Sequence, residues 1–114
     1  MNKYLLLLLL PSLVMARDFP EKHYQEQWCK GEVEHVLPDR ARVDCLTDEY
    51  AIEFDFADKA DQALGQALRY SAATNKKPGI VLIVEKEKDY RYVLKLYNTL
   101  QHHSLKIKVW VIRP

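Results

Sequence analysis

Apolar and charged residues alternate with a period of two in two neighbouring segments, 41–46 and 50–56. Such alternation predicts two β-strands, each with one apolar face and one charged face. The apolar positions are Val43, Cys45, Ile52, Phe54 and Phe56, and the charged positions are Arg42, Asp44, Glu53 and Asp55. Because only a few residues separate the two segments, we expect them to form a β-hairpin.

A two-residue turn at positions 48–49 fixes the register of this predicted hairpin. In that register Asp44 lies opposite Glu53, and Arg42 lies opposite Asp55, so each pair shares one face of the hairpin. A slip of one residue would set the carboxylates against the apolar side chains. The pattern therefore predicts that acidic side chains from the two strands lie beside one another.

The remaining elements follow from helical spacing and from short apolar runs. Helices are expected over 20–29, 57–74 and 88–103, and further strands over 32–37, 80–84 and 106–112. We expect Ala60, Leu64, Ala67, Leu68 and Ser71 to line the inner side of the second helix, and Tyr92, Val93, Leu96, Tyr97 and Leu100 that of the third. The unbroken apolar run at 80–84 is typical of a strand covered on both faces.

The predicted element order is α-β-β-β-α-β-α-β. Alternating helices and strands in the second half favour parallel pairing, whereas the three consecutive strands favour an antiparallel meander. We therefore predict an α/β fold with a mixed five-stranded sheet flanked by helices on both sides.

Residues 1–16 differ in composition from the remaining chain. Lys3 precedes an apolar run, and small residues follow near Ala16, as in a secretory signal peptide. The run is short and interrupted for a membrane span, although an uncleaved anchor is the alternative interpretation. We expect residues 17–114 to form a single exported domain, periplasmic or secreted, with no stable membrane association after signal cleavage.

Cys29 and Cys45 are the only two cysteines of the chain. Export would place them in an oxidising compartment, where a disulfide between them is expected. This bond would close a loop of about 16 residues and contribute about 3 kcal/mol to stability. Two buried free thiols are the alternative.

Charge is balanced in total but unevenly distributed along the chain. Positions 18–61 hold thirteen acidic and five basic residues, whereas positions 62–114 hold three acidic and ten basic ones. An acidic metal pocket beside a basic flank that holds phosphates would produce this asymmetry. Two solvated faces that attract each other across the fold would produce it equally well.

The element order, with Asp44 and Glu53 on consecutive strands and the Gln66-Ala-Leu-Arg-Tyr70 segment on the next helix, resembles the PD-(D/E)xK nuclease superfamily. The likeness spans approximately positions 24–112. The Gln-x-x-x-Tyr helix is similar to that of the RecB-type nucleases, and the compact size is similar to that of the archaeal Holliday-junction resolvases. The resemblance implies a restriction-endonuclease-like core and a Mg²⁺- or Mn²⁺-dependent nuclease that hydrolyses DNA.

The resemblance also implies roles for individual residues. Asp44 and Glu53 would be metal ligands, and an upstream acid, either Glu34 or Glu26, would complete the shell. Gln66 and Tyr70 would line the substrate side.

Elementary electrostatics supports a cation at this place. Carboxylates of Asp44, Glu53, Asp55 and Glu34 on one face would repel one another unless a cation lay between them. A hard divalent cation prefers such oxygen ligands, and it provides what hydrolysis of a phosphodiester requires.

The sequence departs from the superfamily pattern at position 55, where aspartate replaces the motif lysine. An ionised aspartate cannot orient an attacking water by donating a hydrogen bond. Lys59 is one substitute, because it precedes Gln66 by two helical turns and would share its face. Arg42 could instead neutralise Asp55 or contact a phosphate. The alternative function is a catalytically inactive module that binds nucleic acid or a protein partner.

Overall fold

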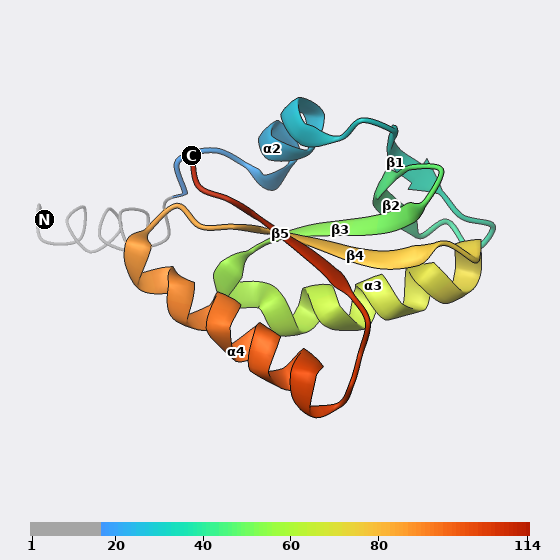
Figure 1. Cartoon of the computed structure of the whole chain (residues 1–114). Helices are drawn as coiled ribbons and strands as arrows, with labels where there is room; N and C mark the ends of the chain where they lie inside the picture. Colours follow the sequence, from blue (N-terminus) through green and yellow to red (C-terminus); the bar gives the residue numbers. More distant parts are fainter. Residues whose placement is uncertain (1–16) are drawn as a thin grey trace, which may run out of the picture.

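The computed structural model describes residues 17–114, so the predicted signal peptide lies outside the described residues. The described chain folds around one five-stranded sheet whose strand order follows the sequence, β1-β2-β3-β4-β5 (Figure 1). The strands are β1 (Glu32–Val36), β2 (Arg42–Leu46), β3 (Tyr50–Phe56), β4 (Lys77–Ile83) and β5 (Lys108–Ile112). The helices are α2 (Glu21–Trp28), α3 (Ala60–Thr74) and α4 (Tyr90–His102).

The sheet is mixed, as the sequence predicted. Strands β1, β2 and β3 pair antiparallel, whereas β3, β4 and β5 pair parallel. Helix α2 lies over one face of the sheet, and α3 and α4 lie over the other (Figure 1). The predicted α/β class and the mixed five-stranded sheet with flanking helices are confirmed.

Strand β4 contributes to the cores on both faces of the sheet. Ile80 and Leu82 pack with α3 and α4, whereas Val81 and Ile83 pack on the side of α2. All four side chains are at most 1 % exposed. The prediction of a strand covered on both faces is therefore confirmed.

Both long helices begin later than predicted. Each is preceded by one 3₁₀ turn, η1 (Ala57–Lys59) before α3 and η2 (Glu87–Asp89) before α4. Such turns are common at helix ends, where i→i+3 hydrogen bonds tighten the chain. Strand β4 begins three residues earlier than predicted, because Asn75 ends α3 in the left-handed conformation and turns the chain directly into the sheet.

The inner faces of the two helices differ in part from the prediction. The buried residues of α3 are Ala60, Ala63, Ala67 and Tyr70, and those of α4 are Val93, Leu96 and Leu100. Leu68 is 40 % exposed and Tyr97 is 46 % exposed, so the prediction that they face inward was wrong. The small alanines and Tyr70 form the sheet-facing side of α3, and Leu68 is left at the margin of that side.

The register of the β2–β3 hairpin is the predicted one. Cys45 pairs with Ile52, and Leu46 pairs with Ala51. The turn at 48–49 is closed by Thr47, whose main-chain nitrogen donates to the Tyr50 carbonyl at 2.9 Å and whose hydroxyl accepts from the Tyr50 nitrogen at 2.9 Å. A threonine before the turn thus replaces the stronger turn residues that the sequence lacks.

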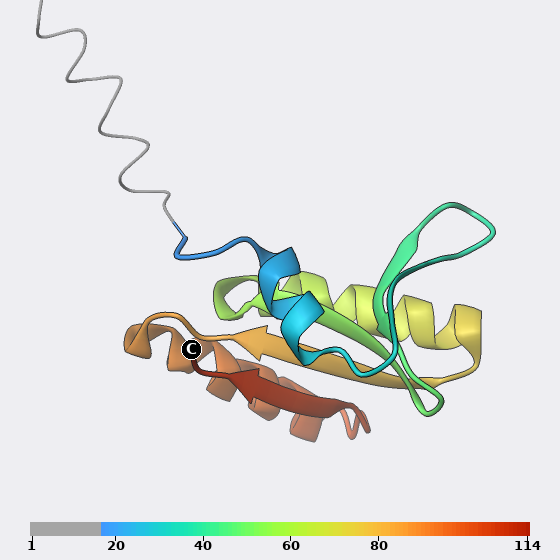
Figure 2. The ribbon, with the colours of Figure 1, turned by 90° about the horizontal axis from the view of Figure 1, so that it is seen from above.

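The β1–β2 hairpin bends out of the plane of the other three strands (Figure 2). The bend occurs at Glu34, which has a φ of 54° and lies between the paired residues Val33 and His35. Beyond the bend, Val43 packs against Ala51 and its neighbours rather than against Phe54, as strict alternation would require. The bend is therefore the reason that the predicted facing of Val43 was wrong.

The predicted disulfide between Cys29 and Cys45 is present. It joins the end of α2 to the middle of β2, and Cys45 is fully buried. Close to it, Gly31 lies so near β2 that a Cβ atom there would be 2.1 Å from the Leu46 carbonyl oxygen. Glycine is therefore required where the chain leaves α2 and enters β1.

None of the helices within residues 17–114 is both long enough and apolar enough to cross a membrane.

Removing the disulfide is expected to lower the free energy of unfolding. The bond closes a loop with a sequence separation of 16 residues, so the Cys29→Ala/Cys45→Ala variant should lose about 3 kcal/mol, because its unfolded chain gains loop entropy. Urea unfolding followed by circular dichroism would measure the loss. The wild-type protein in reducing agent should show a similar loss, and a difference below about 1 kcal/mol would contradict the expectation.

Candidate functional site

The regular pairing of β2 with β3 stops at Cys45 and Ile52. At the next position the Asp44 nitrogen donates to Glu53 Oε1 at 3.4 Å, and the Phe54 nitrogen donates to Asp44 Oδ2 at 2.8 Å. Two side-chain carboxyls thus accept hydrogen bonds from the main chain of the opposite strand, where backbone carbonyls would normally do so. The two acidic residues that the sequence placed opposite each other do lie together.

A third acidic side chain reaches these two from α2. The carboxyl of Glu21, in the first turn of that helix, lies close enough to the Asp44 carboxyl that the charge of Asp44 raises the pKa of Glu21. Sequence reasoning had nominated Glu34 or Glu26 as the upstream acid. Glu26 is instead exposed and lies 4.0 Å from the Lys22 ammonium.

Glu21 could have been found from the helical spacing. It precedes Tyr24 by three residues and Trp28 by seven, which places it on the inward face of α2 with these aromatic residues. Glu26 lies outside that pattern.

Asp55 also belongs to this group and is 7 % exposed. Its Oδ1 accepts a hydrogen bond of 3.0 Å from the Phe56 nitrogen. Burial raises the pKa of Asp55 to about 6, while this hydrogen bond and the nearby Lys59 ammonium lower it. We refer to Glu21, Asp44, Glu53 and Asp55 as the acidic cluster.

Burial and mutual repulsion raise the pKa of the other three carboxyls as well. Burial is the larger cause for Glu21, and the charges of Asp44 and Asp55 add to it, so that the pKa of Glu21 is about 7. For Glu53, which is 3 % exposed, burial and then the charge of Asp44 raise the pKa far above its usual range. Burial likewise raises the pKa of Asp44. The cluster therefore holds protons near neutral pH.

The basic residues near the cluster are arranged differently from the prediction. Among the described residues Arg42 forms its ion pair with Glu34 and not with Asp55: its guanidinium donates to Glu34 Oε2 at 3.0 Å, across the paired strands β1 and β2. Lys59 is exposed and lies close enough to lower the pKa of both Asp55 and Glu21. It belongs to the 3₁₀ turn before α3 rather than to the regular helix.

The two α3 residues predicted to line the substrate side differ in their environment. Tyr70 is 6 % exposed and packs with Leu37, Val43 and Ala51. Burial raises its pKa, and the charge of Glu53 raises it further, so the phenol lies near the cluster. Gln66 is exposed, one helical turn before Tyr70.

Gln25 is a buried polar residue beside the cluster that sequence reasoning missed. Its side chain is 3 % exposed, and its Nε2 donates to Glu21 Oε1 at 2.9 Å. Its Oε1 is buried without a hydrogen-bond partner, the one such side-chain atom recorded within residues 17–114. Gln25 therefore holds the Glu21 carboxyl in position, and its own Oε1 remains available to accept a hydrogen bond.

Within residues 17–114, no group of three or more histidine, cysteine, aspartate or glutamate side chains is already arranged to hold a metal ion. The chemistry of the donors nevertheless fits a hard divalent cation, because all of them are carboxyl oxygens. A soft metal that prefers thiolate ligands is not favoured, since both cysteines are in the disulfide.

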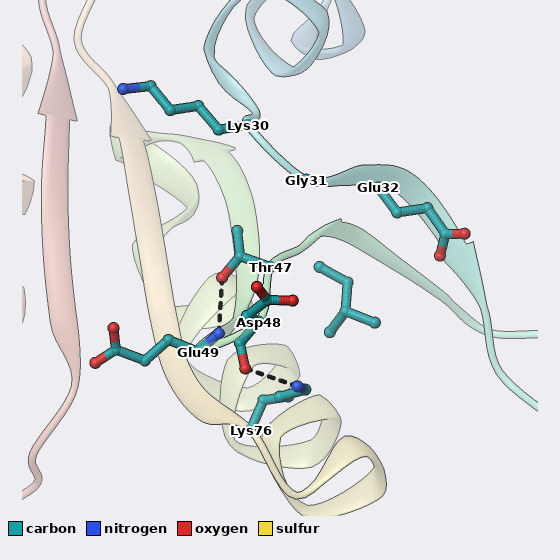
Figure 3. Close-up of a pocket in the computed structure, with 8 residues that line it drawn as sticks. Lys30, Gly31, Glu32, Thr47, Asp48, Glu49 and Lys76 are labelled. Atoms are coloured by element: carbon teal, nitrogen blue, oxygen red, sulfur yellow. Dashed lines mark hydrogen bonds between the residues drawn. The ribbon is translucent and has the colours of Figure 1, made fainter.

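The cavity shown in Figure 3 lies away from the cluster, beside the β2–β3 turn. It has a volume of about 640 Å³ and is lined by Lys30, Gly31, Glu32, Leu46, Thr47, Asp48, Glu49 and Lys76. The Lys76 ammonium donates to the Asp48 carbonyl at 2.6 Å, and positive and negative groups are mixed around the opening. No member of the acidic cluster lines this cavity. The acidic cluster is therefore the candidate site because of its carboxyl groups, and this cavity is not part of it.

Comparisons with known proteins do not add to this description. No family model matches the chain, and neither a curated protein nor a solved structure gives a significant match.

The acidic cluster should make the folded protein less stable as the pH rises. Because the carboxyls of Glu21 and Asp55 have raised pKa values of about 7 and about 6 in the folded state, the folded state binds more protons than the unfolded chain from about pH 4 to about pH 7. The free energy of unfolding should therefore fall through that window by several kcal/mol.

Urea unfolding between about pH 5 and about pH 8 in the presence of chelator would measure this slope. Glu21→Gln should reduce it, because an amide cannot ionise, whereas the exposed Glu26→Gln in the same helix should leave it unchanged. Equal slopes in the two variants would show that the cluster does not titrate as described.

Proposed function

We propose that this protein is an exported, Mg²⁺- or Mn²⁺-dependent nuclease that hydrolyses phosphodiester bonds of DNA. The observation that carries the proposal is the convergence of four acidic side chains from α2, β2 and β3 where β2 leaves β3. Gathering carboxyls in a buried place raises their pKa and lowers stability, so folding alone gives no reason for it. Binding a divalent cation does give a reason.

A restriction-endonuclease-like core is the architecture that we propose for this function. It is supported by the element order and by the meander β1-β2-β3 that continues through α3 into the parallel strand β4. The likeness to the PD-(D/E)xK superfamily remains one of element order and of residue placement. The contacts that support this placement are the hydrogen bonds of Asp44 and Glu53, each of which accepts from the main chain of the opposite strand.

Asp44 and Glu53 would hold the cation, and Glu21 and Asp55 would complete the oxygen donors around it. Glu34 lies near enough to raise the pKa of Asp44 but is engaged with Arg42, so we give it a supporting role. A bound divalent cation would offset the charge of the phosphate and lower the pKa of a water molecule.

The remaining roles fall to residues on the α3 side of the cluster. Lys59 carries a positive charge beside Asp55 and Glu21, in place of the motif lysine that position 55 lacks. Its exposed ammonium, or the exposed amide of Gln66, would orient the attacking water by hydrogen bonding. Tyr70 is buried near Glu53, so its main role would be to hold the Glu53 side chain in position.

The second candidate is a binding module of the same fold that does not hydrolyse its ligand. The replacement of the motif lysine by Asp55, and the lack of a preformed group of metal ligands within residues 17–114, favour it. Such a module would bind nucleic acid or a protein partner without cleaving it.

The compartment follows from the disulfide. A Cys29–Cys45 bond in a small domain is compatible with an oxidising location outside the cytoplasm. We therefore place the proposed activity in the periplasm or in the extracellular space.

Cation binding is testable by calorimetric titration of Mn²⁺ into the purified protein. We expect heat from one site and the release of protons, because the carboxyls that bind the ion must lose the protons that they share. The heat should depend on the ionisation enthalpy of the buffer. Asp44→Asn should abolish it, whereas Glu26→Gln should not, and the absence of heat in the wild-type protein would contradict the cation site.

Hydrolysis is testable by the conversion of supercoiled plasmid to relaxed circles in Mg²⁺ or Mn²⁺. We expect Glu53→Gln and Glu21→Gln to lower the rate by about 100-fold or more, since each removes a charged oxygen from the site. The matched control is Glu26→Gln, which should retain the wild-type rate. Binding of DNA without relaxation by the wild-type protein would favour the non-catalytic module, and neither binding nor relaxation would contradict both candidates.

A further inference from the structure

The tip of the β1–β2 hairpin is a tight turn with an unusual residue. The Leu37 nitrogen donates to the Ala41 carbonyl at 2.8 Å, and the Arg40 nitrogen donates to the Leu37 carbonyl at 2.9 Å. Arg40 has a φ of 72°, in the left-handed region. Three-residue hairpin loops of this form usually place glycine at that position.

Folding does not explain an arginine at this position. A side chain in the left-handed region is disfavoured relative to glycine, because its Cβ crowds the backbone. Arg40 is exposed, and within residues 17–114 no ion pair or side-chain hydrogen bond recorded for the protein involves its guanidinium. The backbone strain is therefore not offset by a contact within the described chain.

The hairpin is nevertheless held firmly against the body of the protein. Asp39 Oδ1 accepts from the Ala41 nitrogen at 3.0 Å, and Asp39 Oδ2 accepts from the Arg69 guanidinium of α3 at 2.8 Å. Leu37, next to the turn, and Val43 on β2 pack with Ala51 of β3 and Tyr70 of α3. The tip therefore has a fixed position relative to the acidic cluster.

That fixed position places positive charge next to the cluster. Arg42 lies two residues before Asp44 on β2, about 7 Å along the strand, and Arg40 lies further from Asp44, in the turn that precedes β2. The Arg42 side chain is 64 % exposed and points to the side of Glu34. A polyanion approaching the acidic cluster would otherwise be repelled by it, and cations at this distance would offset the repulsion.

We propose that the β1–β2 hairpin is a rigid arm, bent out of the sheet at Glu34, whose Arg40 and Arg42 bind DNA phosphates beside the one that is cleaved. The inference rests on the proposed function, and it extends that function by naming the element that holds the substrate. Figure 2 shows the hairpin standing out from the sheet on the side of β3 away from β4. Arginine suits this role because its planar donors match phosphate oxygens.

The test uses substitutions at Arg40 that separate charge from strain. Arg40→Gly and Arg40→Asn remove the charge and tolerate the left-handed conformation, whereas Arg40→Lys keeps both the charge and the strain. All are made in the Glu53→Gln background, so that DNA is not cut in Mg²⁺. Affinity for a fluorescently labelled 20-base-pair duplex is measured by anisotropy over a series of salt concentrations, and stability by thermal unfolding.

We expect Arg40→Gly and Arg40→Asn to bind DNA about fivefold or more weakly, with the salt slope reduced by about one. Both should melt at a higher temperature than the parent. Arg40→Lys should bind within about twofold of the parent, because it retains a phosphate-binding charge. Lys88→Ala, an exposed lysine in η2 at the far end of the molecule, is the control and should also bind within about twofold.

The outcomes distinguish the arm from the proposed function. If the parent binds DNA and the Arg40 variants bind equally well, the arm is overturned while the nuclease proposal stands. If Lys88→Ala weakens binding as much as Arg40→Asn does, the contribution is a general charge effect and the arm is again overturned. If the parent does not bind DNA and the wild-type protein does not relax plasmid, both proposals fail.

Discussion

The structure depends on the hydrogen bonds by which two carboxyls join the main chains of β2 and β3. Asp44 accepts from the Phe54 nitrogen, and Glu53 accepts from the Asp44 nitrogen, at the position where the regular ladder ends. Because a carboxyl side chain takes the place of a main-chain carbonyl in each of these bonds, β2 and β3 lie further apart here than in a regular antiparallel pair. The separation leaves room for Glu21 from α2, and it releases the β1–β2 hairpin to bend away from the sheet. The acidic cluster and the arm thus have one origin.

The disulfide compensates for the instability that this arrangement introduces. Cys45 adjoins Asp44, and Cys29 ends the helix that carries Glu21, so the bond ties together the two elements that bring the repelling carboxyls to the cluster. Buried like charges would tend to push α2 away from the sheet. A covalent link, the aromatic packing of Trp28 on Phe54 and the close approach at Gly31 oppose that tendency. A small domain with a modest core would have few other means of retaining such a site.

Sequence reasoning succeeded where the signal was local. The alternation in 41–46 and 50–56 predicted both strands and their register, because a slip of one residue would exchange the apolar and the acidic faces, and it thereby placed Asp44 beside Glu53. Sequence reasoning failed for features that depend on contacts between elements far apart in the chain. The sequence did not indicate the positive φ of Glu34 or the ion pair of Arg42 with Glu34. The helical spacing did place Glu21 on the inward face of α2, but only the fold shows that this face lies near Asp44.

The aspartate at position 55 changes how such a site would respond to pH. A lysine there would keep the neighbouring carboxylates ionised, whereas Asp55 adds a fourth acid and leaves only the exposed Lys59 to offset the charge. Near neutral pH the cluster retains protons, and a cation must displace them before it can bind. Rising pH therefore favours cation binding while it weakens the fold without a cation. In this site the ion would both complete the chemistry and restore the stability that ionisation removes.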